Sequence, residues 1–446
     1  MRTSASQPAS GPSASLSRRC RTLTSFLEKA GVPGGAPSPT HDKSASSPLG
    51  GRGGGDDGDE DEGHISASPP PAPAVHRFLA GTAEVMSTGG NAMVMLEYDE
   101  EERAVNTVGT PFAYDSGEIW SLAPRPVLNA DDSRAVLACF LSRKGVRGMS
   151  LSTVQGARGL TVRTQLEESE GAWAVAWNRR GNRAASAHQD GSVKIWRPRE
   201  DGEDMAVEVT GAATSASAAT MPGASTLGLP SPAEGEARDI AWDPMEDDLV
   251  VIARGFHAVG VDTRQPATAA FEIATKGKCR SVDVNPNRPH YILTAGDEGA
   301  VRFWDARKTA EPVQSLSRGG HSHWITKARY NPFHDQLVLT GSTDGLVCLW
   351  RAASVSSAPI SADADLVLGV EEDHGMGMDY GARSRDLSSS RSEQDGLVKA
   401  YDEHKHESVF GVAWSAVDAW VFASVSYDGK LFARSVPSAT KYQILL

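Results

Sequence analysis

The sequence lacks the residue patterns that usually support catalysis or metal binding. Its 446 residues include only four cysteines, Cys20, Cys139, Cys279 and Cys348, and no two of them form a Cys-x-x-Cys pair. Such sparse cysteines argue against zinc and dithiol redox motifs and fit a reducing, intracellular compartment. Phosphate-binding loops, dinucleotide fingerprints, Gly-x-Ser-x-Gly elbows and His-Glu-x-x-His motifs are also missing. The sequence therefore predicts no catalytic residue, no metal ligand and no cofactor.

Long apolar runs and an excess of positive charge are missing as well. No window approaches 18 consecutive apolar residues, which argues against a membrane-spanning helix. The 57 acidic residues outnumber the 44 basic ones, and the formal net charge is -13. Because an acidic chain repels phosphate backbones, we expect no nucleic acid partner. Basic surfaces on partner proteins fit this charge better.

Low-complexity composition divides the chain. Residues 1–75 are rich in Ser, Pro, Gly and Ala and carry an acidic run at 56–62. Such a segment buries too little apolar area to offset its chain entropy, which predicts a disordered tail that folding does not need. An excess of Lys and Arg near the N-terminus leaves a targeting peptide as an alternative. The folded domain is expected over 76–446, with disordered loop insertions at about 200–235 and 353–400.

A repeat organises the remaining sequence. An apolar strand that ends in an aromatic residue or proline is followed, about twenty residues later, by an acid-Gly turn and an alternating strand that often ends in Trp. Trp304 and Trp350, which end two such units, are 46 residues apart. Alternation around an acid-Gly turn predicts antiparallel hairpins, and a unit of about 40–45 residues that ends in Trp-Asp is typical of a WD40 blade.

The number of repeat units predicts an all-β, seven-bladed WD40 β-propeller. Six units run from about residue 112 to the C-terminus, and a partial unit precedes them at 77–98. The innermost strand of this first blade is not recognisable in the preceding tail. A propeller must close its ring to hide its sheet edges, so the first blade is the part of this interpretation that the sequence supports least.

One blade carries a His, Ser, Asp and Trp set that could be mistaken for a catalytic triad. His321, Ser342, Asp344 and Trp350 have the spacing of the hydrogen-bond chain found inside WD repeats. In such a chain the Asp accepts from the His, and the hydroxyl links to the indole N–H. We therefore predict a buried structural network.

The binding surface is predicted from two kinds of position that share one face of the disc: the residue before each innermost strand and the residue before each turn acid. Trp324 and Tyr427 are expected to be exposed beside charges there, a composition typical of binding hot spots. Packing of Trp324 against neighbouring blades is the alternative. The full set is Glu118, Glu236, Lys278, Trp324 and Ser408 before the strands, and Gln189, Asp297, Thr343 and Tyr427 before the acids.

From about residue 76 onward the chain resembles the EARP- and GARP-complex-interacting protein family of WD-repeat proteins. The match is dense in the second half and includes His321-Ser-His-Trp324, Leu339-Thr-Gly-Ser342, Ser426-Tyr-Asp-Gly429 and the terminal Lys441-Tyr-Gln-Ile-Leu-Leu446. The resemblance implies a non-enzymatic scaffold that binds protein subunits of EARP- and GARP-type tethering complexes. It also implies a role in endosomal recycling and retrograde vesicle transport, and a cytoplasmic location, peripheral to the trans-Golgi network and endosomes, without membrane insertion.

A competing function comes from one blade terminus. Trp304, Asp305 and Arg307 form a Trp-Asp-x-Arg sequence that resembles the box through which some propellers act as substrate receptors of cullin ubiquitin ligases. A weaker echo lies at 261–264. The same sequence also arises where a blade simply ends. Affinity purification separates the two functions, because tether subunits favour the scaffold and a ligase adaptor favours the receptor.

Overall fold

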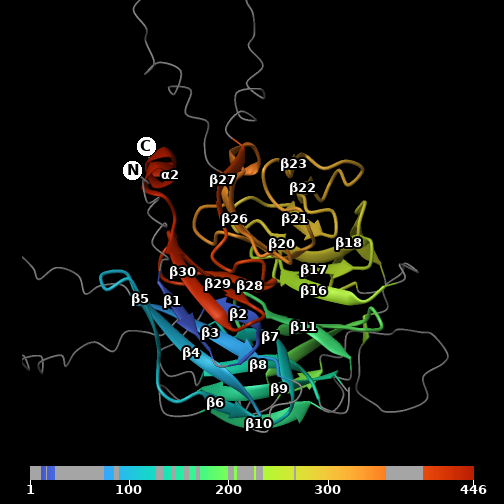
Figure 1. Cartoon of the computed structure of the whole chain (residues 1–446). Helices are drawn as coiled ribbons and strands as arrows, with labels where there is room; N and C mark the ends of the chain where they lie inside the picture. The colour runs from blue at the N-terminus through green and yellow to red at the C-terminus, as the bar shows by residue number, and fades with distance from the viewer. Residues whose placement is uncertain are drawn as a thin grey trace, which may run out of the picture.

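A computed structural model describes residues 12–16, 18–25, 75–84, 90–126, 134–142, 147–154, 160–166, 171–198, 205–207, 226–227, 235–265, 268–357 and 395–445. These residues form seven antiparallel sheets that follow one another around a ring (Figure 1). The prediction of a seven-bladed β-propeller is confirmed. We number the blades by the order of their innermost strands.

Each blade contributes one innermost strand to the wall of a central channel. These strands are β2 (Cys20–Ser25), β7 (Glu118–Pro124), β11 (Ala172–Trp177), β16 (Ala237–Trp242), β20 (Cys279–Val284), β24 (Ile325–Tyr330) and β28 (Val409–Trp414). The second strands are β3 (His76–Thr82), β8 (Arg134–Leu141), β12 (Ala184–His188), β17 (Leu249–Arg254), β21 (Tyr291–Gly296), β25 (Leu337–Ser342) and β29 (Val421–Ser426).

The outer part of each blade is less regular. The third strands are β4 (Asn91–Asp99), β9 (Arg147–Val154), β13 (Val193–Pro198), β18 (His257–Asp262), β22 (Val301–Asp305), β26 (Val347–Arg351) and β30 (Lys430–Ser435). The fourth strands are β5 (Ala104–Thr107), β10 (Leu160–Leu166), β14 (Met205–Val207), β19 (Ala269–Ala274), β23 (Gln314–Leu316), β27 (Gly396–Tyr401) and β1 (Ser13–Ser15). Two short strands, β6 (Phe112–Tyr114) and β15 (Thr226–Leu227), pair with β4 and β13.

The N-terminal segment closes the ring, which corrects the predicted domain boundary at residue 76. β2 is the innermost strand of the first blade, and β1 is the outermost strand of the seventh, where Ser13 pairs with Phe432. Figure 1 shows these blue strands beside the red strands of the C-terminus. Since β1 completes the seventh blade and β2 supplies the innermost strand of the first, the expectation that folding does not need residues 1–75 no longer stands. The rest of that prediction, at 1–11, 17 and 26–74, lies outside the described residues.

The predicted insertions are also shorter than expected. The segment 353–357 contains a 3-10 helix, η3 (Ala353–Val355), whose Val355 is fully buried, and β27 begins at Gly396 as the outermost strand of the sixth blade. In the other insertion, β14 and β15 both pair with β13. The remaining parts of the two insertions lie outside the described residues.

Apolar side chains pack between neighbouring blades rather than in one central core. Trp350 of the sixth blade, for example, packs with Phe303 and Leu293 of the fifth. All four cysteines are buried and none is in a disulfide, and burial raises the pKa of the Cys20, Cys279 and Cys348 thiols to about 12, which keeps them protonated. In the described part of the chain, no helix combines the length and apolarity needed to span a membrane.

Candidate functional site

Every innermost strand carries a β-bulge at the same place, near the end where the strand begins. Each bulge adds one residue that has no partner in the second strand, and such a residue bends the strand and re-aims its side chain. The seven residues, one from each blade, are Arg21, Trp120, Trp173, Arg238, Arg280, Thr326 and Phe410. We call this set the bulge ring.

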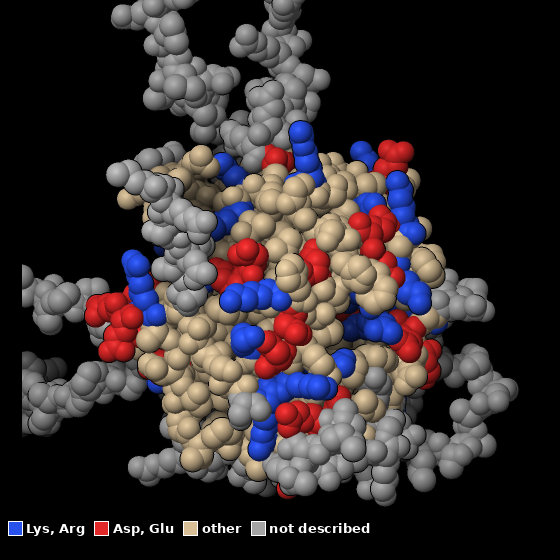
Figure 2. Space-filling view, viewed as in Figure 1, with Lys and Arg blue, Asp and Glu red and all other residues tan. Residues whose placement is uncertain are grey.

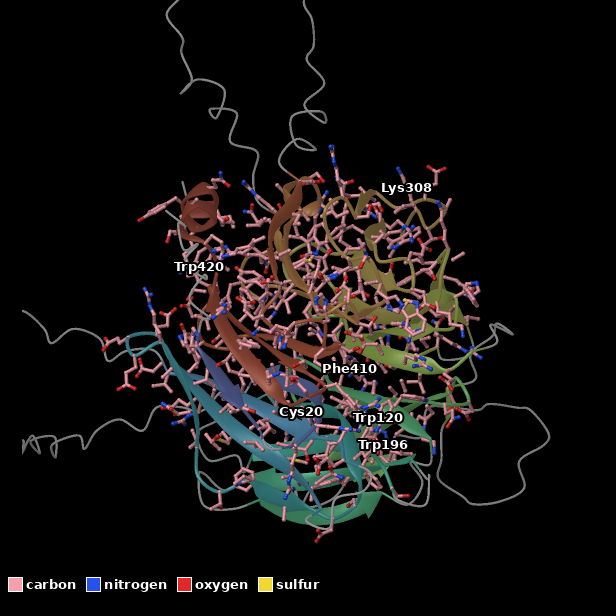
Figure 3. All side chains as sticks on the ribbon, in the orientation of Figure 1. Cys20, Trp120, Trp196, Lys308, Phe410 and Trp420 are labelled. Atoms are coloured by element: carbon pink, nitrogen blue, oxygen red, sulfur yellow. The ribbon has the colours of Figure 1, made fainter. Side chains whose placement is uncertain are left out.

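The bulge ring surrounds one mouth of the channel. All seven side chains are half-buried, and together with Ser121 and Lys327 they line a cavity of about 110 Å³. Figure 3 shows Trp120 and Phe410 near the middle of the propeller, close to Cys20, whereas Lys308 and Trp420 lie toward its outside. Because each blade contributes a side chain, this mouth is the place where all seven blades meet.

Arginines stack on aromatic rings along one arc of the bulge ring. The Arg21 guanidinium carbon lies 4.0 Å from the ring centroid of Trp120 and 5.1 Å from that of Phe410. Trp120 meets Trp173 edge-on, with centroids 5.1 Å apart, and Arg238 lies 4.7 Å from the Trp173 centroid. Cation–π contacts of this length hold the planar guanidinium groups against the rings.

Acidic side chains neutralise two of the three arginines. Arg238 forms an ion pair with Glu236, with an N–O distance of 2.5 Å, and Arg280 pairs with Asp297 while lying 4.2 Å from the Trp324 ring centroid. Figure 2 likewise shows Lys and Arg side chains intermingled with Asp and Glu over the visible face. The surface therefore presents paired charges rather than a field of one sign.

The structure brings the predicted binding positions together beside the bulge ring. The backbone N–H of the residue before a turn acid donates to the carbonyl of the residue before the innermost strand in several blades. Thr343 donates to Trp324 over 3.0 Å and Tyr427 to Ser408 over 2.9 Å. Equivalent bonds join Asp297 to Lys278 and Gln189 to Gly171, while Gly255 donates to Glu236. The two kinds of position therefore share one face, as the sequence predicts.

Two predicted surface residues are less accessible than expected. Glu118 is buried, and its carboxylate accepts a hydrogen bond from the Trp120 indole over 3.1 Å. Tyr427 is half-buried beneath the N-terminal strand, because the Arg19 side chain lies over its ring and donates to its hydroxyl over 3.2 Å. Trp324 keeps 42% of its surface exposed although it contacts Arg280. Of the two predicted aromatic anchors, only Trp324 is largely accessible.

Below the bulge ring the channel widens into a cavity of about 740 Å³ whose wall holds a buried charge cluster. Asp239 accepts from Lys327 over 2.8 Å and from Arg329 over 3.1 Å. Burial alone would raise the pKa of the Asp239 carboxyl, but these two cations outweigh it and lower that pKa. Burial raises the pKa of Asp283 to about 6, against the opposing effects of Arg329 and of two backbone N–H donors.

The channel therefore contains acid and base groups that the sequence pattern did not reveal. Asp239 is also bonded to the Ser281 hydroxyl and the Val282 N–H, so both of its oxygens are occupied. The contacts cross from the fourth blade to the fifth and sixth. An occupied network of this kind joins blades, and it offers no free base beside a nucleophile.

The predicted blade network exists around a different hydroxyl. The Trp350 indole donates to Thr340 Oγ1 over 2.8 Å, and Thr340 Oγ1 meets His321 Nε2 at 2.7 Å. His321 Nδ1 lies 3.4 Å from Asp344. Ser342, the predicted link, only accepts from the Asp344 backbone N–H at 3.2 Å. Thr340 and Ser342 point to the same side of β25, but Thr340 is the one within reach of the indole.

Hydrogen bonds fix the acid at the end of this network. Burial alone would raise the pKa of the Asp344 carboxyl, but donation from His321 and from the backbone N–H groups of Leu346 and Ser322 lowers that pKa. Other blades repeat the indole-to-hydroxyl bond of this network: Trp196 donates to Ser186 and Trp304 to Thr294, each over 2.8 Å. This hydrogen bond holds the second and third strands of a blade together.

The Trp-Asp-x-Arg sequence has a local structural role. Trp304 is buried, whereas Arg307 keeps 63% of its side chain exposed and pairs with Asp305 over 2.7 Å. Asp262 and Arg264 form the same two-residue pair over 2.7 Å. Since the pair closes a turn in both blades, this geometry does not distinguish a ligase-binding box from an ordinary blade terminus.

One group in the described part of the chain could hold a metal ion. Ligand atoms of His76, Glu100 and Asp418 lie within 4.8 Å of one another. His76 Nδ1 already contacts the Ser415 hydroxyl at 2.9 Å, and Glu100 is exposed and accepts from Ser435. Carboxylates gather in this way at many protein surfaces, so the group does not by itself identify a metal site.

Comparison with known proteins gives the same architecture and also identifies relatives that match most of the chain. A family model described as the EIPR1 beta-propeller matches residues 231–350, and a WD domain, G-beta repeat model matches 160–197 and 395–432. EARP and GARP complex-interacting protein 1 of Homo sapiens is 32% identical over 384 residues, which cover 83% of this chain and 93% of that protein. EARP-interacting protein 1 of Caenorhabditis elegans is 35% identical over 48% of this chain and 54% of its own length. WD repeat-containing protein DWA2 of Arabidopsis thaliana is 34% identical over 35% and 38%.

Proposed function

The chain belongs to the family of EARP and GARP complex-interacting proteins, and from this premise we propose that it is a non-enzymatic WD40 scaffold that binds EARP- and GARP-type tethering complexes. By binding these complexes in the cytoplasm, at the surface of the trans-Golgi network and endosomes, it supports endosomal recycling and retrograde vesicle transport. The partners are protein subunits of the complexes, and the scaffold does not insert into the membrane.

One observation carries this proposal. The likeness to the human relative covers 93% of that protein, and the name of that protein states that it interacts with the EARP and GARP complexes. A match over nearly the whole length includes the blades that form the channel mouth, rather than a single WD repeat that unrelated propellers also have. A fold alone does not imply a function, so the length of the match matters here.

The bulge ring and the adjoining Trp324 supply a suitable binding surface. Tryptophan and arginine are the residue types that most often dominate protein–protein binding energies. Trp120, Trp173, Arg238 and Arg280 are half-buried at the mouth, so ordering them further on binding costs little side-chain entropy. The occupied network of the channel wall supports binding rather than catalysis as the activity of this face.

Capture of the complexes by the full chain tests the function. We expect the tagged wild-type protein to recover EARP and GARP subunits from a lysate of cells that express it, with identification by mass spectrometry. Trp324→Ala combined with Phe410→Ala removes two aromatic groups from the mouth, and we expect it to reduce recovery at least tenfold. Recovery of a cullin ligase adaptor in place of tether subunits would refute the proposal.

A variant on the opposite face provides the matched control. Phe333 follows β24 at its other end and is 45% exposed, similar to Trp324 at 42%. Phe333→Ala should leave recovery unchanged if the mouth is the binding surface, and all variants should melt within a few degrees of wild type. Equal recovery by the mouth variant and wild type would place the binding surface elsewhere. Imaging of the tagged chain with trans-Golgi and recycling-endosome markers tests the location.

A further inference from the structure

Arg21 differs from the other two arginines of the bulge ring because no acid among the described residues neutralises it. Arg238 and Arg280 each form an ion pair, with Glu236 and Asp297. In the part of the chain that the structure describes, Arg21 makes only ring contacts, and its Nε atom is covered without a hydrogen-bond partner. The guanidinium thus lacks a described acid, and a carboxylate that reaches its other N–H groups would form a charge-assisted hydrogen bond.

Aromatic rings hold the Arg21 guanidinium in place. Its central carbon lies 4.0 Å from the Trp120 centroid and 5.1 Å from the centroids of both Phe410 and Tyr427. These rings come from the first blade's two neighbours, so the side chain is fixed at the seam between the chain ends. A guanidinium that is already ordered loses little entropy when it binds a ligand, and its planar N–H groups can donate to both oxygens of a carboxylate.

We propose that Arg21 anchors an acidic side chain, Asp or Glu, from an otherwise apolar segment of the protein partner at the mouth of the channel. The cavity of about 110 Å³ beside Arg21 has room for one such side chain but not for a folded element. The faces of Trp120, Trp173 and Phe410 around it favour apolar neighbours in the partner segment. The inference rests on the proposed function, because it names the chemistry by which the partner is recognised.

Charge distribution favours a single carboxylate over a phosphate polymer. Glu236 and Asp297 already neutralise Arg238 and Arg280 at this mouth, and Glu118 adds a carboxylate beside Trp120, so a polyanion would find few unpaired positive charges here. The formal charge of the whole chain, -13, adds to that repulsion. One buried acid that meets the one unneutralised arginine avoids these acids. A single acid at this mouth differs from the basic partner surface that the net charge of the chain suggests.

A random-peptide library tests the chemistry of the mouth directly, because it samples many peptide sequences at once. The full chain is immobilised, and a phage-displayed library is selected on it. We expect the enriched peptides to contain an Asp or Glu flanked by apolar residues. Synthetic copies, labelled with fluorescein, then give dissociation constants by anisotropy. Replacement of the acid by its amide in the peptide should weaken binding about tenfold or more, as expected for a lost charge-assisted hydrogen bond.

Three variants of the protein locate the contact. Arg21→Gln should weaken the acidic peptide about tenfold or more and should bind the amide peptide as wild type does, since the pair is then already broken. Arg21→Lys keeps the charge without the planar stack and should give a smaller loss. Arg264→Gln, which removes an exposed arginine with a 67% accessible side chain far from the bulge ring, should bind as wild type.

Several outcomes would overturn the inference. They are a selected pool without acidic bias, a pool with no enrichment at all, and an Arg21→Gln variant that binds acidic peptides within twofold of wild type. Capture of phosphatidylserine vesicles by the mouth in place of any peptide would also overturn it. If wild type recovers tether subunits and Arg21→Gln recovers them equally, the inference fails while the proposed function stands. If wild type recovers none, the proposed function fails, and the peptide experiment still decides the chemistry of the mouth.

Discussion

Replacing Thr340 by valine tests the hydrogen-bond chain inside the sixth blade. Valine has nearly the shape of threonine and keeps the β-branched side chain that suits β25, so the change removes little except the hydroxyl. In the structure that hydroxyl serves both the Trp350 indole and the His321 ring. Trp350 and Thr340 are fully buried, so water cannot replace the lost partner.

The expected loss follows from the two groups left without a partner. A buried polar group that loses its hydrogen bond costs about 1–3 kcal/mol. For the indole N–H and His321 Nε2 together we expect the free energy of unfolding to fall by about 2–4 kcal/mol. The Asp344 contact of His321 remains, which keeps the estimate below the sum of two full penalties. Ser342→Ala removes only an acceptor for the Asp344 N–H, so its expected loss is below about 1 kcal/mol.

Urea denaturation followed by tryptophan fluorescence and by far-ultraviolet circular dichroism measures both variants. A lower midpoint with an unchanged slope indicates a change in stability rather than in the denatured state. The two substitutions lie two residues apart on the same strand, so differences in strand propensity largely cancel between them. If Ser342→Ala costs as much as Thr340→Val, or more, then Thr340 is not the centre of the network and our assignment is wrong.

Three further predictions follow from the same contacts. A chain that begins at residue 26 lacks β1 and β2 and should not give soluble, cooperatively unfolding protein, whereas a chain that begins at residue 12 should. Solubility tests and thermal melts compare the two chains. A folded chain from residue 26 would show that the ring closes without these strands. Trp350→Ala should lower the free energy of unfolding by about 3–5 kcal/mol through lost packing and a cavity, and Asp344→Ala by less; a melt of Trp350→Ala within a degree of wild type would contradict the buried position of this indole. Burial lowers the pKa of His404 from 6.5 to about 4, so its neutral form stabilises the fold above pH 6.5 and that stability is lost as the pH falls toward 4, by up to about 3 kcal/mol. His404→Gln should make the free energy of unfolding depend less on pH in this window than it does in wild type, which denaturation at several pH values measures. An unchanged pH dependence would mean that the pKa of His404 does not differ between the folded and unfolded states.

The blades were predictable where the sequence repeats its own chemistry. Acid-Gly turns followed by alternating strands that end in Trp recur at 190–196, 298–304 and 344–350, and each became a second hairpin with its Trp buried. β2 was not predictable in this way. Four of the six residues in its sequence, Cys-Arg-Thr-Leu-Thr-Ser, are polar, and fifty residues separate its end at Ser25 from His76, the start of its partner strand. Long-range pairing of a weak strand leaves no local pattern.

The candidate site was only partly predictable for a similar reason. Alternation assigns successive residues to opposite faces of a strand, and a bulge breaks that rule at one residue. Trp173, Arg238 and Arg280 stand in equivalent places, directly after the first buried residue of their strands, and their large or charged side chains were the available signal. In a strand of regular alternation, that position is an ordinary outward-facing one. Thr340 and Ser342 point to the same side of their strand and differ in their distance from the Trp350 indole, and sequence spacing cannot show which hydroxyl is within hydrogen-bond distance.

The position of Arg21 connects partner binding to closure of the ring. Arg21 lies on β2, the strand that the N-terminal segment delivers to the seam, and Cys20 and Leu23 on either side of it are buried against the first and seventh blades. A partner that binds Arg21 binds the closed ring and not the open one. By linkage, a partner present at about 100 times its dissociation constant stabilises the closed state by about 2.7 kcal/mol. Hydrogen exchange of the backbone amides of β2 should therefore slow when the acidic peptide is added, while exchange in β21, on the opposite side of the ring, stays unchanged. Equal slowing in both strands would mean that the peptide stabilises the fold as a whole, and no slowing in β2 would separate the seam from the binding site.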